Sequence, residues 1–238
     1  MSQPIIIMGA NGGIGGALAK RLIDKGQDVF LTAQDADTLS DFDAPAASVD
    51  VFDEDSITTA IEEADGGEGF KGLAYCIGSI NLKPFKRTTD DDYMKTMELN
   101  FLGAARALRA AEDGLKKGKG SVVLFSTIAM EQGFPQHSAI SSAKGALEGL
   151  GRTLAAEWAP NVRVNIIAPS LTDTGIAKGI TSSEQMAEAV AKMHPIPRLG
   201  TADDSAAAAE FLLSEDSSWM TGQTLHIDGG RSTLRTKG

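Results

Sequence analysis

Short apolar segments alternate along this chain with longer segments whose apolar positions recur every three or four residues. Seven segments have the length and apolar character of buried strands: residues 4–8, 28–33, 47–51, 73–77, 121–126, 163–168 and 224–228. Four segments have helical spacing: residues 17–25, 91–115, 138–158 and 203–213. Alternation of this kind is typical of a parallel sheet with helices on both faces. The pattern therefore predicts an α/β fold that is doubly wound around a mostly parallel, seven-stranded sheet.

The chain is predicted to be one domain, residues 1–238, because it has no internal repeat, low-complexity tract or linker. Its 238 residues, of which 42% are hydrophobic and 23% are charged, suit an α/β domain with a single large core. The segment 173–197 has the weakest pattern. We expect this segment to form a mobile, helical flap over a functional site.

Charge and cysteine content narrow the classes of function. The net charge is −10, so a nucleic-acid binder, which needs a basic surface, is not expected. No apolar run approaches the roughly 20 residues that span a bilayer, so no membrane partner is expected. Cys76 is the only cysteine, which rules out an internal disulfide and favours a reducing compartment. Because residues 1–4 also lack a signal-peptide pattern, we expect a cytoplasmic protein.

A glycine-rich segment lies directly after the first predicted strand and shortly before the first predicted helix. Its sequence is Gly9-Ala10-Asn11-Gly12-Gly13-Ile14-Gly15. Glycine allows a positive φ and lets backbone N–H groups approach a pyrophosphate, and the N-terminus of the following helix favours an anion. A glycine-rich turn in this position is a good indication of dinucleotide binding. The sequence therefore predicts a nucleotide site at residues 9–15.

The spacing of Gly9, Gly13 and Gly15 resembles that of the short-chain dehydrogenase/reductase family rather than the tighter Gly-x-Gly-x-x-Gly of other dehydrogenases. Further blocks resemble motifs of this family in the right order: Asp50-Val51, Asn100, Arg163 to Pro169 with Thr174, Pro197 to Gly200, Thr221 to Gln223, and Asp228 to Gly230. The resemblance runs the length of the chain. The sequence differs from the usual motifs of this family at Met8, at residues 75–77 and at Ser170, which indicates an outlying branch of the family.

The resemblance implies a Rossmann-type domain, an NAD(P) cofactor and a homotetramer. The residues that it places at the cofactor are Gly9, Asn11, Gly13, Ile14, Gly15, Gln34, Asp50, Val51, Gly78, Lys144, Pro169, Thr172 and Thr174. In the tetramer, the predicted helices 91–115 and 138–158 would form one interface through stripes of small and apolar residues. The internal core of the subunit explains part of those stripes equally well.

The end of the second predicted strand bears on the choice between NAD(H) and NADP(H). A carboxylate at this position accepts hydrogen bonds from the ribose hydroxyls of NAD, whereas an arginine beside it holds the 2′-phosphate of NADP. This chain has Ala33-Gln34-Asp35 there, and residues 26–70 contain no Lys or Arg. The acidic residues of this segment would repel a 2′-phosphate. We therefore expect a preference for NAD(H).

The position of the catalytic tyrosine is the main departure from the family. In the family, a tyrosine four residues before a lysine is the general acid/base, and a serine thirteen residues before the tyrosine orients the carbonyl. Residues four apart lie on one face of a helix, so the lysine lowers the pKa of the tyrosine and also binds the ribose. Here the lysine is Lys144, the serine position is Thr127, and the tyrosine position is Ile140, which has no proton to give. Asn100 resembles the family's structural and catalytic asparagine, which with Lys144 would hold a proton-relay water.

His137 is the candidate replacement for the missing tyrosine. It lies seven residues before Lys144, two helical turns away on the same face. Related enoyl-acyl carrier protein reductases carry their tyrosine at this spacing, and a histidine can donate a proton at neutral pH. The alternative is a surface histidine in the loop that enters the helix. No set of His and Cys residues has the spacing of a metal site, so no metal is expected.

The sequence thus favours an NAD(P)-dependent oxidoreductase of the short-chain type. It would act on a small carbonyl, alcohol or enoyl substrate, with His137 or water as the proton donor. A second hypothesis is a catalytically degenerate member that binds dinucleotide as a sensor or partner subunit, because the chain lacks the tyrosine and keeps Lys144. A third is that Ile140 is an engineered or strain-specific change.

Overall fold

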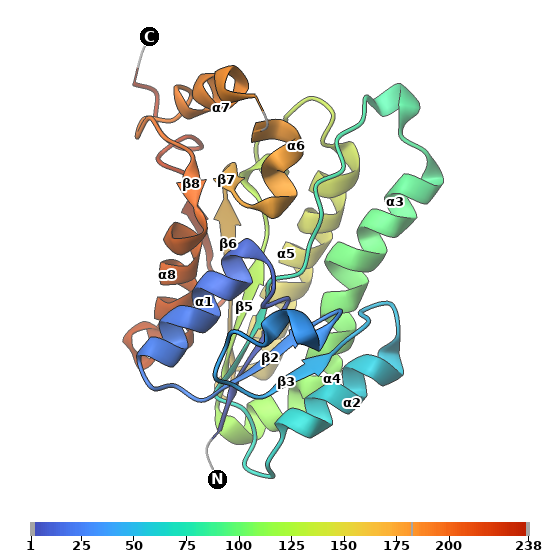
Figure 1. Ribbon diagram of the computed structural model, residues 1–238, viewed down its shortest axis with the longest axis vertical. Coiled ribbons are helices and arrows are strands. Elements are labelled where there is room, and N and C mark those ends of the chain that lie inside the picture. The colour runs from blue at the N-terminus through green and yellow to red at the C-terminus, as the bar shows by residue number, and fades with distance from the viewer. Residues whose placement is uncertain (1–2, 182, 237–238) are drawn as a thin grey trace.

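The computed structural model describes residues 3–181 and 183–236, and its centre is a seven-stranded sheet (Figure 1). The strands are β1 (Ile5–Met8), β2 (Val29–Ala33), β3 (Ala46–Ser48), β4 (Gly72–Tyr75), β5 (Ser121–Phe125), β6 (Arg163–Pro169) and β9 (Thr224–Ile227). Their order across the sheet is β3-β2-β1-β4-β5-β6-β9, and every neighbouring pair is parallel. The prediction of a doubly wound α/β domain with seven strands is confirmed, and this sheet is wholly rather than mostly parallel.

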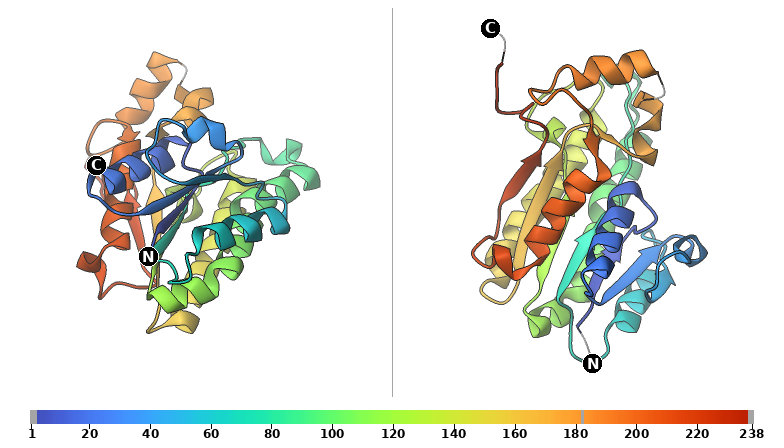
Figure 2. Two further views of the ribbon diagram at one scale, coloured as in Figure 1. Left: turned by 60° about the horizontal axis from the view of Figure 1, so that its bottom comes forward. Right: turned by 60° about the vertical axis from the view of Figure 1, so that its left-hand side comes forward.

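Helices cover both faces of the sheet, as a parallel sheet requires (Figure 2). On one face, α1 (Gly13–Asp24) packs beside α8 (Ala202–Leu213), and Leu18 and Leu212 meet Ile7 and Leu31 of the strands. The other face carries α2 (Glu54–Ala64), α4 (Gly103–Gly118) and α5 (Ser138–Trp158). Alternate strand residues therefore enter two separate apolar cores, one on each side of the sheet.

The helix α2 was not predicted, although its sequence contains a usable signal. Asp53 caps its first turn by accepting a hydrogen bond from the backbone N–H of Asp55 at 3.0 Å. Its buried residues are Ile57, Ala60, Ile61 and Ala64. This spacing of three and four is the apolar stripe of an amphipathic helix. The many acidic residues of this segment hide a short stripe, because they make its average composition resemble that of a solvated loop.

The helix predicted over residues 91–115 is wrong in detail, because two helices and a wider turn occupy that stretch. The first helix, α3 (Asp90–Met97), is followed by a π-helical turn, Glu98–Leu102, and then by α4. A π-helical turn contains one extra residue and is frequent at functional sites. Here the turn contains Asn100, whose side chain is fully buried.

Thr89 and Asp92 form a capping box at the start of α3, and its contribution to stability can be tested. The hydroxyl of Thr89 accepts a hydrogen bond from the backbone N–H of Asp92, and the Asp92 carboxylate accepts one from the backbone N–H of Thr89. Thr89→Ala removes this capping box and is expected to lower the free energy of unfolding by about 1 kcal/mol in urea denaturation. The hydroxyl of the neighbouring Thr88 donates to the carbonyl oxygen of Pro84 at 3.3 Å and takes no part in capping α3, so Thr88→Ala serves as the control. An equal loss in the two variants would contradict the assignment.

The described residues of the segment 173–197, all but residue 182, include two short helices, and they lie beyond the carboxyl ends of β6 and β9 (Figure 1). The segment contains α6 (Lys178–Thr181) and α7 (Glu184–Ala191), and a small parallel sheet of β7 (Thr172–Asp173) and β8 (Gly200–Thr201) closes its base. A short 3-10 turn, Gly175–Ala177, precedes α6, and other 3-10 turns span Ala36–Leu39, Phe85–Arg87, Ile128–Met130 and Glu215–Ser217. None of the helices in the described residues is long and apolar enough to cross a membrane.

Candidate active site

The strand order places a crevice at the carboxyl ends of β1 and β4. Strands β1, β2 and β3 follow one another in one direction across the sheet, and β4, β5 and β6 follow in the other. In open α/β sheets, ligands bind outside the carboxyl ends of the strands at the point where the order reverses. The glycine-rich turn follows β1, and residues 76–78 follow β4, so both predicted segments lie at this point.

The glycine-rich turn has no room for side chains. Gly9 has a φ of +81°, and a Cβ atom on Gly15 would lie 2.3 Å from the carbonyl oxygen of Gly9. A Cβ atom on Gly13 would lie 2.7 Å from Cγ2 of Thr174. The turn therefore meets the loop after β6, which brings together two segments predicted to hold the cofactor. Helix α1 begins at Gly13, and no side chain caps its first N–H groups, so these groups can bind an anion.

Several residues that are predicted to bind the cofactor follow the ends of β2 and β3: Gln34, Asp50 and Val51. The Asp50 carboxylate accepts a hydrogen bond from the backbone N–H of Phe52 at 2.9 Å, and the carbonyl oxygen of Val51 accepts one from Arg106 at 3.3 Å. Gln34 is exposed. The Asp35 carboxylate accepts a hydrogen bond from the backbone N–H of Asp37 at 3.1 Å, which caps the turn that follows β2.

Asn100 and Lys144 converge on Gly78, the glycine after β4. A Cβ atom on Gly78 would lie 3.0 Å from Oδ1 of Asn100 and 3.4 Å from Nζ of Lys144. Asn100 is fixed because its Nδ2 donates hydrogen bonds to the carbonyl oxygen of Thr96 at 3.0 Å and to Oγ of Ser79 at 3.3 Å. The π-helical turn thus holds the amide of Asn100 in a fixed orientation beside Gly78, where the ammonium group of Lys144 also lies. These three predicted residues lie together in the structure.

Lys144 is nearly buried, with 6% of its surface exposed. Burial lowers the pKa of Lys144 to about 8, while the nearby Cys76 raises it slightly. Burial also raises the pKa of the Cys76 thiol to about 12, so this thiol is neutral at ordinary pH. The proximity of Cys76 was not predicted. Its position two residues before Gly78, directly after a strand that ends at the crevice, is the signal that could have shown it.

Ile140 and Thr127 occupy the predicted tyrosine and serine positions. Ile140 lies one turn before Lys144 on α5 and is 4% exposed, so an apolar side chain fills this place. Thr127 follows β5 and is half-buried, and its Oγ1 accepts a hydrogen bond from the backbone N–H of Ala129 at 3.2 Å. This bond leaves the hydroxyl proton of Thr127 free to donate.

His137 lies at the entrance to α5, directly before the first residue of the helix. Its Nδ1 lies 2.8 Å from the carbonyl oxygen of Pro135, and because a carbonyl can only accept, Nδ1 is the donor. The ring packs edge-on against Phe134, with 5.5 Å between the ring centroids. Seven residues of helix place His137 about 10 Å from Lys144 along the axis. This separation is the one that the spacing in the sequence implies, so the role of His137 as a proton donor stays a prediction.

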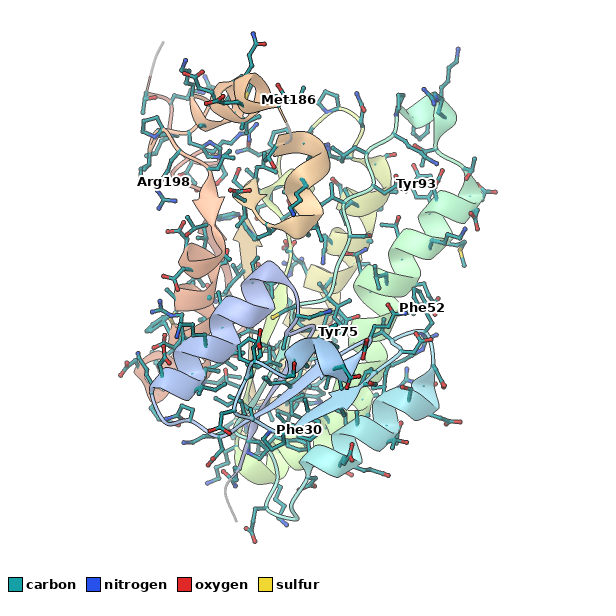
Figure 3. The ribbon with its side chains drawn as sticks, viewed as in Figure 1. Phe30, Phe52, Tyr75, Tyr93, Met186 and Arg198 are labelled. Atoms are coloured by element: carbon teal, nitrogen blue, oxygen red, sulfur yellow. The ribbon has the colours of Figure 1, made fainter. Side chains whose placement is uncertain are left out.

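The two tyrosines of the chain lie outside α5, one at the end of β4 and one on α3. Tyr75 points into the apolar core and donates its hydroxyl to the carbonyl oxygen of Leu99 at 2.9 Å (Figure 3). Burial raises the pKa of Tyr75 above its usual range. Tyr93 is half-buried on the first turn of α3.

A cavity of about 660 Å³, lined by Phe52 among others, opens beside α3 and the π-helical turn.

The loop after β6 connects the sheet to the segment 173–197 through hydrogen bonds. Thr172 donates a hydrogen bond to the carbonyl oxygen of Ser170 at 3.0 Å, and Thr174 donates one to the carbonyl oxygen of Thr172 at 3.4 Å. Oγ of Ser170 lies 2.8 Å from Nε2 of the buried His194, whose Nδ1 donates to the carbonyl oxygen of Val190 in α7. Pro169 ends β6 directly before this loop. The Ser170–His194 bond was not predicted, because the two residues are 24 positions apart.

No metal centre is visible in residues 3–181 and 183–236. No group of three or more His, Cys, Asp or Glu side chains lies close enough together there to hold an ion. The buried carboxylate of Glu148 is held instead by protein groups: Ser126 donates to it at 2.6 Å and Arg152 pairs with it at 3.1 Å.

Comparisons with known proteins cover nearly the whole chain. A family model described as enoyl-(acyl carrier protein) reductase matches residues 9–232. The 2-(S)-hydroxypropyl-CoM dehydrogenase 3 of Xanthobacter autotrophicus is 33% identical over 252 residues, which cover 98% of each chain. A short-chain type dehydrogenase/reductase from Mycobacterium ulcerans is 28% identical, with a TM-score of 0.91 over 99% of this chain and 92% of that one. ElxO with NADP bound is 27% identical, with a TM-score of 0.90 over 98% of this chain and 100% of that one.

Proposed function

The chain belongs to the short-chain dehydrogenase/reductase family of oxidoreductases, and from this premise we propose that it uses a nicotinamide dinucleotide to interconvert a small carbonyl or enoyl compound and its reduced form. The observation that carries the proposal is the convergence of Asn100 and Lys144 on Gly78, at the crevice that the glycine-rich turn borders. The cofactor supplies or accepts a hydride when it is bound.

The residues of the crevice fit such a cofactor. The closely packed turn at Gly9 and Gly15 leaves backbone N–H groups for the pyrophosphate, and Gly13 and Thr174 face each other beside it. Lys144 and Asn100 lie where they can bind the ribose and a water, and Thr127 can donate its hydroxyl to a substrate oxygen. The related ElxO binds NADP, which supports a dinucleotide of this class for the present chain.

The experiment that tests the function measures oxidation of NADH by the purified protein in the presence of a panel of small aldehydes, ketones and enoyl thioesters. Turnover with any of them supports the proposal. Binding of NADH without turnover would favour a second function, that of a dinucleotide-binding sensor or partner subunit. One observation favours this second function, namely the apolar Ile140 at the tyrosine position.

We propose that the preferred cofactor is NAD(H). The stretch of sequence that contains Gln34, residues 26–70, has no Lys or Arg, and Asp35 and Asp37 place negative charge beside Gln34. A 2′-phosphate there would be repelled by these carboxylates. Gln34→Arg is expected to strengthen NADPH binding by about tenfold, because one charge-assisted hydrogen bond contributes about 1.5 kcal/mol.

The matched control for this change is Gln34→Met, which alters the same side chain without adding charge. Isothermal titration of each variant with NADH and NADPH measures the shift. Unchanged NADPH affinity in Gln34→Arg would show that this position does not face the 2′-hydroxyl.

A homotetramer remains our proposal for the assembly, with a smaller interface stripe than the sequence indicated. Ala104, Ala107, Leu108 and Leu147 are buried in the core of the subunit. Three further small or apolar residues of α4 and α5 are half-exposed: Ala105, Leu150 and Leu154. These residues on α4 and α5 are the ones that a partner would cover. A monomeric mass at micromolar concentration in sedimentation would contradict the proposal.

A further inference from the structure

We propose that the ε-ammonium group of Lys144 is itself the proton donor for carbonyl reduction, in the place where Ile140 supplies none. This inference rests on the proposed function and names the residue that completes it. It is an alternative to the prediction that His137 donates, and it rests on Nζ of Lys144, which lies beside Gly78 and Asn100.

The position of Lys144 is that of a group which can reach the substrate. Its Nζ lies beside Gly78 together with the amide of Asn100, at the crevice where the sheet order reverses. Gly78 has no side chain to separate the two groups from that space. Ile140 occupies the preceding turn on the same face of α5, so the residue at the tyrosine position offers no hydroxyl to a ligand in the crevice.

The ammonium group is also free of a carboxylate. Glu148 lies one turn after Lys144, the spacing at which a salt bridge on a helix is usual. The Glu148 carboxylate is instead held by Ser126 at 2.6 Å and Arg152 at 3.1 Å. Within the described ranges, none of the salt bridges includes Lys144, and the only titratable side chain that acts on it is Cys76. A proton on Nζ is therefore available to a ligand.

The acidity of the group suits the role. An exposed lysine is a poor acid near neutral pH, since its pKa is about 10.4. Burial disfavours the charged form and lowers the pKa of Lys144 to about 8. The neighbouring thiol of Cys76 is neutral, because burial raises its pKa to about 12. At pH 7 the amine is thus protonated and still close to the pKa at which general acids are effective.

The step balances in atoms and electrons. The carbonyl carbon of the substrate gains a hydride, with its electron pair, from the reduced nicotinamide, and the C=O π bond becomes a lone pair on oxygen. That oxygen takes a proton from Lys144, forming an O–H bond as an N–H bond breaks. The products are the alcohol, the oxidised cofactor and a neutral amine. Water in the crevice returns a proton to the amine, and alcohol oxidation is the reverse of these steps.

The first test needs neither cofactor nor substrate. The protein is labelled with ¹³C-lysine, and the ε-methylene resonances are followed against pH by NMR, with Lys144→Arg identifying the signal of Lys144. The proposal expects a midpoint near 8 for this one lysine. A midpoint above about 10, the value of an exposed lysine, would overturn the inference.

The second test separates the charge of Lys144 from its ability to release a proton. Arginine keeps a cation at the ribose but is not deprotonated in proteins. Lys144→Arg is expected to keep NADH binding while single-turnover reduction of diacetyl falls by about 10²–10⁴-fold, the usual contribution of a general acid. Lys144→Met should lose both. An arginine variant that reduces diacetyl at the wild-type rate would overturn the inference.

The pH dependence adds a readout that a merely structural role would not change. Reduction needs the protonated amine, so its rate should be constant below pH 8 and fall above it, whereas alcohol oxidation should rise over the same range. Failure of the wild-type protein to oxidise NADH with any carbonyl of the panel would overturn the proposed function. An active enzyme with an unshifted lysine would overturn only the inference.

Discussion

Ile140→Tyr is expected to raise the rate of carbonyl reduction by at least about tenfold, since a positioned general acid contributes about 10²–10⁴-fold. Ile140 lies one turn before Lys144 on the same face of α5. A phenol at this position would take over proton donation from a lysine that then stays charged. The ammonium group beside it favours the phenolate and so lowers the pKa of the phenol. Single-turnover reduction of diacetyl by NADH measures the gain.

Packing is the competing effect at this position. Ile140 is 4% exposed, so a larger ring forces its neighbours to move, at a cost of about 1–3 kcal/mol in stability. Ile140→Phe has the same ring without the hydroxyl and reports this cost alone. The expected order of rates is the tyrosine variant above the wild type and the phenylalanine variant at or below it. Equal rates for the tyrosine and phenylalanine variants would contradict a proton-transfer role for the site.

Gly15→Ala is expected to weaken NADH binding by about a hundredfold or more, equivalent to roughly 2.7 kcal/mol. A Cβ atom at this position would lie 2.3 Å from the carbonyl oxygen of Gly9, closer than any non-bonded contact allows. The turn has to open to relieve the clash. Its backbone N–H groups then no longer point at the pyrophosphate. Calorimetric titration with NADH measures the loss.

Gly12→Ala is the matched control within the same turn. Its Cβ atom would meet only the carbonyl oxygen of Gly9, at 3.2 Å, and its φ of −78° suits any residue. A much smaller loss of affinity is expected. Circular dichroism and thermal melting of both variants check that the domain still folds. Wild-type affinity in Gly15→Ala would show that the turn does not bind the dinucleotide.

The sheet could be predicted from the sequence because its strands are buried on both faces. Such strands are short, continuous apolar runs, and the seven predicted runs correspond to the seven strands of the sheet. The helices were harder to predict. Helix α1 begins at Gly13 rather than at residue 17, because glycine in its first turn has low helix propensity and conceals the start. The interruption of α3 and α4 at Asn100 depends on one inserted residue, which leaves no periodic signal.

The candidate site could be predicted where local motifs determine it. The glycine-rich turn, Gly78, Asn100 and Lys144 are each recognisable from their neighbours in sequence, and the structure brings the last three together. The role of His137 was inferred from helical spacing alone, and it stays a prediction. Contacts between distant segments, such as Ser170 with His194, depend on the tertiary fold.

Titration calorimetry of the purified protein with NADH, and separately with NADPH, tests most directly whether this crevice is a working nicotinamide site. We expect NADH to bind with one site per chain and more tightly than NADPH, since no cation faces a 2′-phosphate in residues 26–70. Binding of neither dinucleotide would contradict the proposed oxidoreductase and its proton donor together, and the search would then turn from substrates to partner proteins.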